Sequence, residues 1–238
     1  TLINKILTIM WRVLGLVLVF PLALILTNDT LLLLLLVFLQ YIVVYRVVLL
    51  GIPSGFKELG NRAFDANDFK AEMKLFILSM MLTILFAIGG FFLIRYSYLI
   101  MNYEFIIDDF VRINKFLSVT LIISGMLAVL KAYMKPRIEE LYILGNVIYR
   151  GIVILSVILA IILSITLNAG DLVFVMAIGL LVASSVALIY FGYHFYKSFT
   201  DIKYSYNYET QDTKVSVFQL IKYLFKNSLP YVMMLAVL

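Results

Sequence analysis

Long apolar segments alternate with shorter polar ones along the 238 residues of the chain. Each long apolar segment can cross the roughly 30 Å hydrocarbon core of a bilayer as a helix. The predicted spans are Thr8–Leu26, Leu31–Leu50, Leu75–Tyr96, Phe116–Met134, Leu144–Leu167 and Leu172–Tyr193, and a seventh begins near Leu229. Because lipid offers backbone N–H and C=O groups no partner, every span is predicted to be an α-helix. The pattern therefore predicts an all-α polytopic membrane protein with six helices and the start of a seventh.

The polar connections are alternately short and long, and the long ones carry most of the cations. TNDT at 27–30 and NAGD at 168–171 contain no Lys or Arg, whereas the stretches 57–74, 131–137 and 197–226 are basic. The positive-inside rule places the basic connections, and with them the N-terminus, in the cytoplasm. The net charge of +5 is thereby assigned to loops that face anionic lipid. We expect no binding of nucleic acid.

The spans define the domain organisation. Residues 1–197 are predicted to form a six-helix transmembrane lobe, and the polar, Tyr-rich residues 198–216 a cytoplasmic linker. Residues 217–238 are predicted to form an interfacial helix, whose apolar face includes Phe218 and Phe225, followed by the start of the seventh span. The sequence lacks an initiator Met and stops within an apolar segment, so we expect a fragment of a longer protein.

Local signals predict where two helices start and where the second span ends. Asp68 is placed to cap the helix that enters the third span. Pro136 is predicted at the first turn of a helix, where proline is favoured. Gly51 and Pro53 are expected to end the second span and to serve as a hinge or loop.

Composition excludes several functional classes. The chain is 64% hydrophobic and 14% charged, whereas soluble domains are about 25% charged. Without cysteine it has no disulfide framework and no thiol chemistry. Its single histidine, His194, cannot by itself form a metal site or a catalytic triad. We expect no metal and no cofactor.

The stretch GIPSGFKELGNR at 51–62 contains two glycines, Gly55 and Gly60, with a spacing similar to that of a phosphate-binding loop. A P-loop also needs a Lys and then Ser or Thr after the second glycine, because the lysine reaches the terminal phosphates. Asn61 and Arg62 occupy those two positions. We therefore expect no nucleotide.

Four polar residues within or near the spans are candidate substrate-binding residues. Arg46 lies inside the second span, where a cation usually faces a bundle interior or a cavity. Snorkelling is an equal alternative for Arg46, since the cytoplasmic end is about one turn away. Arg12 and Arg150 lie nearer the ends of their spans and can be interfacial anchors as well. Gln40 can bond to a neighbouring helix or line a cavity.

The acidic residues offer one enzymatic alternative. Asp108 and Asp109, adjacent on the exterior side, could hold a divalent ion as in a metal-assisted glycosyltransferase. The surrounding amphipathic pattern instead favours a solvated acidic face on a helix. None of the fourteen Asp and Glu residues falls within the core of a predicted span, where a carboxylate relay for protons or sodium would need one.

Several stretches together resemble polysaccharide exporters of the multidrug/oligosaccharidyl-lipid/polysaccharide superfamily. GIPSGFKELGNRAFDANDFKAEMKLF at 51–76 is similar to their loop between the second and third helices, with Asn67 in place of a glycine. AVLKAYMKP at 128–136 resembles the end of their fourth helix, and NVIYRG at 146–151 keeps the family's arginine as Arg150 but has Asn146 for its acid. LIKYLFKNSLPYV at 220–232 is similar to the start of their seventh helix. RVLGLVLVFPL at 12–22 resembles the first helix, with Val19 in place of a cation.

The resemblance implies a bacterial flippase of the plasma membrane, similar to the sporulation-protein-B-like and O-antigen branch. It would translocate a polyprenyl-pyrophosphate-linked oligosaccharide by alternating access between two MATE-like lobes, of which this chain supplies the first. No covalent chemistry is implied, so we expect no enzyme, and enzymes of cell-envelope glycan synthesis are candidate partners. Arg46, Arg12 and Arg150 would hold the pyrophosphate. The alternatives are an ion-coupled multidrug antiporter, a membrane-embedded glycosyltransferase and a non-transporting scaffold.

Overall fold

The computed structural model describes most of the chain between residues 26 and 205. The described ranges are 26–49, 51–65, 68–100, 107–163, 166 and 169–205, with short pieces at 6–7, 9–11, 13–15, 17–18, 21, 218, 221–222, 225–226 and 229. Nearly all of these residues are helical, and none of them forms a β-strand. The prediction of an all-α chain is thus confirmed for the described residues.

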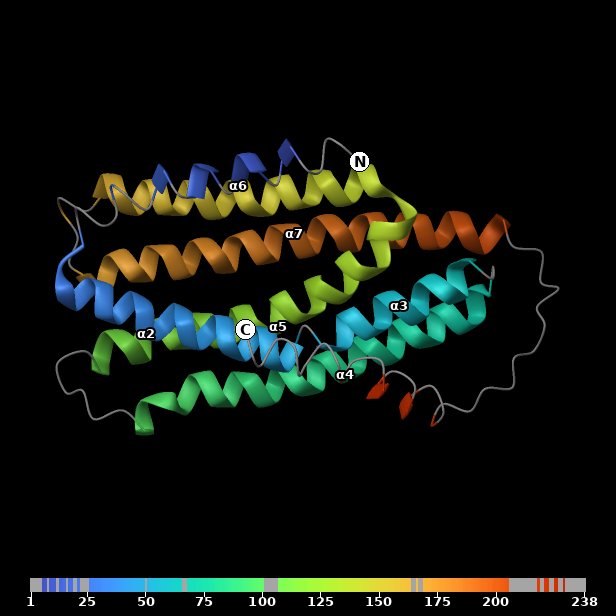
Figure 1. The fold of residues 1–238 in the computed structure, drawn as a ribbon, viewed down its shortest axis with the longest axis horizontal. Coiled ribbons are helices and arrows are strands. Elements are labelled where there is room, and N and C mark those ends of the chain that lie inside the picture. The colour runs from blue at the N-terminus through green and yellow to red at the C-terminus, as the bar shows by residue number, and fades with distance from the viewer. Residues whose placement is uncertain are drawn as a thin grey trace.

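The helices follow one another with short connections (Figure 1). They are α2 (Asn28–Val44), a π-helical turn (Tyr45–Leu49), α3 (Gly51–Asp65), α4 (Phe69–Tyr96), a 3-10 turn (Ser97–Ile100), α5 (Ile107–Arg137), α6 (Glu139–Leu163) and α7 (Ala169–Ser205). Four helical segments are long and apolar enough to cross a membrane, namely Phe69–Leu99, Asp108–Arg137, Glu139–Leu163 and Asp171–Phe199. These four correspond to the third to sixth predicted spans, whereas the first span is described only in short pieces and the seventh only at Leu229.

The four long helices lie side by side with alternating direction (Figure 1). The junction of α3 with α4, the junction of α5 with α6 and the end of α7 gather at one end of the bundle. The starts of α2, α5 and α7 lie at the other end. The first end carries the basic connections, which is the arrangement that the positive-inside prediction requires.

Side-chain caps start two of the helices. Thr27 caps α2, because its hydroxyl oxygen accepts a hydrogen bond from the backbone N–H of Thr30 at 3.3 Å. Asp68 caps α4, and its carboxylate accepts from the backbone N–H of Ala71 at 2.9 Å. Each cap satisfies a donor that has no partner within the first turn of a helix. The predicted cap at Asp68 is confirmed.

The glycine-containing stretch after the second span is helical and not a loop. Gly51 and Pro53 are buried in the first turn of α3, where a proline costs no hydrogen bond. Ile52 and Phe56 are buried on one side of α3 and Lys57 is exposed on the other. Packing of this apolar face against α4 and α5 offsets the poor helix propensity of the glycines.

Pro136 lies at the end of a helix, so the predicted position at a helix start is wrong. It occupies the last turn of α5, which ends at Arg137, and α6 begins at Glu139. A proline in that turn has no N–H to donate to the carbonyl of Ala132, and its ring crowds the same carbonyl, which weakens the last turn. The helix ends one residue later. The backbone N–H of Ile138 still donates to the carbonyl of Met134 at 3.0 Å.

Helix α7 is longer than the span it contains. It continues to Ser205, well past Tyr193, where the sixth span was predicted to end, and into the predicted linker 198–216. The rest of that linker lies outside the described residues, as does most of the predicted interfacial helix. Among the described residues of the latter, the ring of Phe225 lies 6.2 Å from that of Phe86 on α4.

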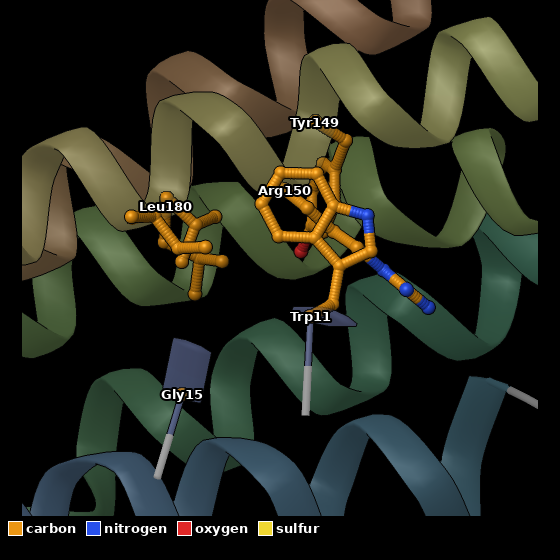
Figure 2. Close-up of a pocket in the computed structure, with 7 residues that line it drawn as sticks. Trp11, Gly15, Tyr149, Arg150 and Leu180 are labelled. Atoms are coloured by element: carbon orange, nitrogen blue, oxygen red, sulfur yellow. The ribbon is translucent and has the colours of Figure 1, made fainter. Parts of the chain in front are cut away.

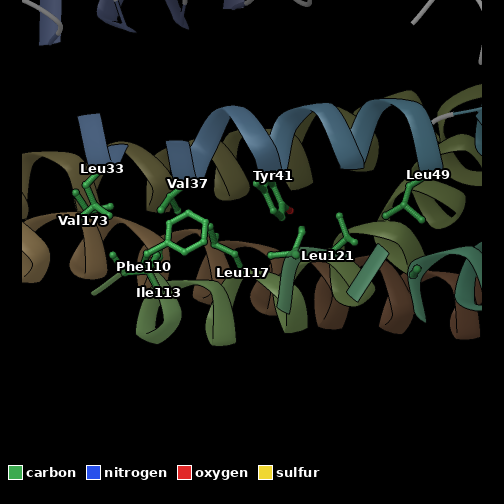
Figure 3. Packing of buried hydrophobic residues seen from close by; sticks show 12 residues of the cluster. Leu33, Val37, Tyr41, Leu49, Phe110, Ile113, Leu117, Leu121 and Val173 are labelled. Carbon is green, nitrogen blue, oxygen red and sulfur yellow. The ribbon is translucent and has the colours of Figure 1, made fainter. Parts of the chain in front are cut away.

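Helix α5 forms the centre of the bundle. Of the most apolar stretch of α5, 67% is buried inside the bundle, whereas the corresponding share is 28% in α4 and 11% in α6. A stripe of buried residues from α2 at a spacing of four meets a stripe from α5, beside two residues of α7 (Figure 3). These are Leu33, Val37 and Tyr41 from α2, Phe110, Ile113, Leu117 and Leu121 from α5, and Val173 and Ala177 from α7. Helix α6 lies at the edge of this core, so one of its faces is free to form a site.

Candidate functional site

Two adjoining cavities lie between the N-terminal pieces and α6, and Trp11 and Arg150 line both. The first, which we call the polar compartment, has a volume of about 190 Å³ and is also lined by Leu7, Lys135, Tyr142, Ile143, Asn146 and Val147. The second, the apolar compartment, measures about 390 Å³ and is also lined by Gly15, Tyr149, Val153, Ile154 and Leu180. Figure 2 shows Leu180 and Gly15 to one side of the Trp11 indole and the Arg150 guanidinium to the other.

Helical spacing brings these side chains to one face. On α6 the polar and aromatic lining residues recur every three or four positions, from Tyr142 through Asn146 to Tyr149. Residues at that spacing lie one above another on a helix. Leu7, Trp11 and Gly15 repeat every four positions on the opposite wall. Because Leu7 accompanies Tyr142 and Gly15 accompanies Ile154, the two walls run in the same direction.

Three cations from two helices surround Tyr149 and the polar compartment. Arg150 comes from α6, and Lys131 and Lys135 come from the last turns of α5. The amine of Lys131 lies 4.4 Å from the ring centroid of Tyr149, and that of Lys135 lies 5.6 Å from the ring centroid of Tyr142. Lys131 is also near enough to Arg150 for the two charges to repel.

No described carboxylate neutralises these three cations. The ion pairs between described residues involve Arg62, Arg112 and Arg137, and none involves Lys131, Lys135 or Arg150. Aromatic faces attract a cation only weakly and leave its charge in place. The site therefore has a local excess of positive charge in a partly buried setting, which is the electrostatic condition for binding an anion.

Hydroxyl groups tie the site to the bundle core. The Tyr149 side chain lies near Ser184 of α7. Ser184 in turn shares a hydrogen bond of 3.0 Å with Ser124 of α5, and the Tyr41 hydroxyl of α2 donates to Ser124 at 3.0 Å. These two bonds join α2, α5 and α7, and Tyr149 of α6 lies next to them, so its position depends on how the helices pack.

The predicted site residues are distributed over several places. Arg150 lines both compartments, and its role in substrate binding stays a prediction. Arg46 is exposed in the π-helical turn and lines neither compartment. Gln40 is half-buried on α2, and its side-chain oxygen is buried without a hydrogen-bond partner. Arg12 lies outside the described residues. Gly51 and Pro53 lie at the start of α3, and a hinge there stays a prediction.

Of the acidic pair Asp108 and Asp109, Asp109 takes part in an ion pair. Arg112 contacts Asp109 at 3.1 Å and Asp171 of α7 at 2.7 Å. Asp108 is exposed in the first turn of α5, where the helix dipole stabilises a negative charge. Within the described ranges, no group of three or more His, Asp or Glu residues could hold a metal ion. The ring of His194 packs against that of Tyr190 at 4.6 Å.

Several residues of the site were absent from the sequence-based prediction: Trp11, Lys131, Lys135, Tyr142, Asn146 and Tyr149. The placement of the N-terminal segment beside α6 is a tertiary feature that local patterns do not encode. A usable signal exists nevertheless. Tyr142, Asn146 and Arg150 form an i, i+4, i+8 series of polar and aromatic residues in an apolar helix, a series that indicates a functional face.

Comparison with known proteins identifies no relative, because no family model, no curated protein and no solved structure matches the chain.

Proposed function

We propose that the chain is the first lobe of a flippase that carries a polyprenyl-pyrophosphate-linked oligosaccharide across the bacterial cytoplasmic membrane. The single observation that carries the proposal is the cluster of Lys131, Lys135 and Arg150, which no described carboxylate neutralises. A diphosphate provides the negative charge that this cluster lacks. The four helices long enough to cross a membrane support a transport role.

The transport step follows from this electrostatic arrangement. The cluster lies at the end of the bundle that we predict to face the cytoplasm, where lipid-linked intermediates are assembled. Arg150 binds the phosphate oxygens with its planar guanidinium, and the lysines supply further charge. Rocking of this lobe against a second lobe would then expose the bound headgroup to the other side. No bond is made or broken, so the function proposed is not enzymatic.

The alternatives lack such an observation. An ion-coupled drug antiporter uses a free intramembrane carboxylate, and the one buried carboxylate among the described residues, Glu72, is paired with Arg137. A glycosyltransferase would require the exterior aspartates, but Asp109 is engaged by Arg112. We therefore favour the flippase.

The test is a substitution in the gene that encodes the chain. Arg150→Gln removes the charge and keeps a hydrogen-bonding side chain, and we expect at least about a tenfold loss in oligosaccharide reaching the outer leaflet. Arg62→Gln is the matched control, because Arg62 is exposed and its ion pair is with Glu58 on its own helix. The readout is the fraction of lipid-linked oligosaccharide that an externally added glycosidase releases, at equal protein levels.

Unchanged export in Arg150→Gln would contradict the proposal. Arg46→Ala in the same assay decides whether Arg46 also contacts the cargo. Our sequence-based expectation is that export is abolished in that variant while the protein level is maintained.

A further inference from the structure

The two compartments differ in chemistry on either side of Trp11 and Arg150. The polar compartment presents an ammonium group from Lys135, a phenol from Tyr142 and an amide from Asn146. The apolar compartment adds the aromatic side chain of Tyr149 and four residues without a polar side chain, namely Gly15, Val153, Ile154 and Leu180. A ligand that fills both compartments must therefore have one charged or hydroxylated end and one hydrocarbon end.

The order of the compartments along α6 matches the orientation of a lipid. Tyr142 lies near the start of α6 at Glu139, and Ile154 lies about 18 Å further along the helix axis. The polar compartment thus lies towards the end of the bundle where α5 meets α6, and the apolar one lies towards its middle. A lipid in a bilayer has the same order, with its headgroup at the surface and its chain inside.

Charge defines the headgroup. Lys135 and Arg150 both line the polar compartment, and neither pairs with a carboxylate in the described part of the chain. Asn146 adds two N–H donors and one acceptor, which suits phosphate or sugar oxygens. A neutral or cationic headgroup would leave the repulsion between the cations in place. The complementary headgroup is a phosphate or a diphosphate.

We propose that this lobe holds one phosphate-bearing lipid in a two-part site, with the phosphate on Lys135 and Arg150 and the first part of its chain in the apolar compartment beside Gly15. The inference rests on the proposed function and deepens it, because it assigns the chain of the cargo to a place within a single lobe. Trp11 separates the two parts and contacts the junction of head and chain. A polyprenyl diphosphate and an anionic membrane phospholipid share this chemistry, and the test distinguishes them.

A substitution at Gly15 can block the hydrocarbon chain of the lipid without changing the phosphate site. A Cβ added at Gly15 would meet no atom within 4 Å, so a larger residue fills the compartment without a clash at that atom. Leucine is also a better helix former than glycine. Gly89 on α4 has equally open surroundings and lines neither compartment. Gly89→Leu is therefore the matched control for Gly15→Leu.

The experiment uses the intrinsic fluorescence of Trp11, the single tryptophan of the chain. The chain is reconstituted in nanodiscs of phosphatidylcholine and titrated separately with inorganic diphosphate, farnesyl diphosphate, a long polyprenyl diphosphate and phosphatidylglycerol. We expect Gly15→Leu to weaken binding of both isoprenoid diphosphates by about tenfold or more and to leave binding of inorganic diphosphate unchanged. Gly89→Leu should bind all four as the wild type does, and Arg150→Gln should weaken binding of every phosphate probe.

The outcomes separate the two proposals. Isoprenoid binding that survives Gly15→Leu but is lost in Arg150→Gln overturns the two-part site and leaves the proposed function standing. Insensitivity of every probe to both substitutions overturns both proposals. If phosphatidylglycerol binds more tightly than the isoprenoids and is equally sensitive to Gly15→Leu, the two-part site is supported, and the flippase function is overturned in favour of a resident phospholipid.

Discussion

Two groups of cations in this bundle differ in whether a described carboxylate neutralises them. Arg137 at the end of α5 is buried together with Glu72 of α4, with 6% and 4% of their side chains exposed, and the two form an ion pair. Lys131, less than two turns earlier on the same helix, has the rings of Tyr149 and Phe191 near its amine and no carboxylate partner among the described residues. The first arrangement neutralises a buried charge and serves packing. The second leaves a charge that the fold does not need, which indicates a ligand.

The opposite end of the bundle shows the same pairing of arginine with carboxylate, between side chains that are more exposed. Arg112 contacts both Asp109 and Asp171, and its carbon Cζ lies 4.7 Å from the ring centroid of Phe174. The ion pair with Asp171 joins α5 to α7, so it has a structural role. Where an arginine holds helices together here, it has an acidic partner. Arg150 has none among the described residues, and it lines both compartments.

The largest expected effect on stability comes from removing the buried ion pair between Arg137 and Glu72. Arg137→Met leaves Glu72 buried without its partner and removes the hydrogen bond that Arg137 donates to the carbonyl of Tyr133. We expect the free energy of unfolding to fall by about 3–5 kcal/mol. Unfolding in a denaturing detergent, followed by circular dichroism, measures it. The double variant with Glu72→Gln should regain part of the loss, and equal stability of Arg137→Met and wild type would refute the structural role.

Lys131→Met is expected to stabilise the protein, in contrast to Arg137→Met. A cation without a carboxylate partner inside the bundle is costly, and methionine fills similar space without charge. After the lost attraction to Tyr149 is deducted, the free energy of unfolding should rise by about 1–2 kcal/mol. Binding of a diphosphate should weaken in the same variant. A fall in stability would show that Lys131 belongs with the structural cations.

Asp171→Asn should have the smallest effect on stability. The pair with Arg112 is partly solvated, since 37% of the Asp171 side chain and 41% of the Arg112 side chain are exposed. Such pairs contribute about 0.2–1 kcal/mol, and Asp109 remains to contact Arg112. The loss should shrink further at high salt, because exposed charges are screened. If Asp171→Asn lowers the free energy of unfolding as much as Arg137→Met, then burial does not determine how much each ion pair contributes to stability.

Much of the architecture was predictable because it follows from local patterns. The apolar spans from Leu75 onwards correspond to four long helices, and Asp68 caps α4 as its position indicated. The helix at Gly51–Asp65 was not predicted, because tertiary packing overrides the propensity of its glycines. Pro136 was misplaced, because the same residue type is tolerated at the start and at the last turn of a helix.

The candidate site was less predictable than the fold. Arg150 was among the candidate ligands because a cation near a span is conspicuous in the sequence. Whether Lys131 and Lys135 have acidic partners depends on which helices are neighbours, and the sequence does not state that. Trp11 reaches the site because the N-terminal segment lies beside α6. For Arg46, the sequence left two environments open, and the structure places this residue in an exposed turn.

The most direct test of the account compares farnesyl diphosphate binding by the wild type and by the double variant Lys135→Gln/Arg150→Gln in neutral nanodiscs. If cations without acidic partners hold an anionic cargo, affinity falls by at least about a hundredfold while thermal stability is unchanged or slightly raised. Arg112→Gln serves as the reference and should retain wild-type affinity. Equal affinity in the double variant and the wild type would contradict the central claim.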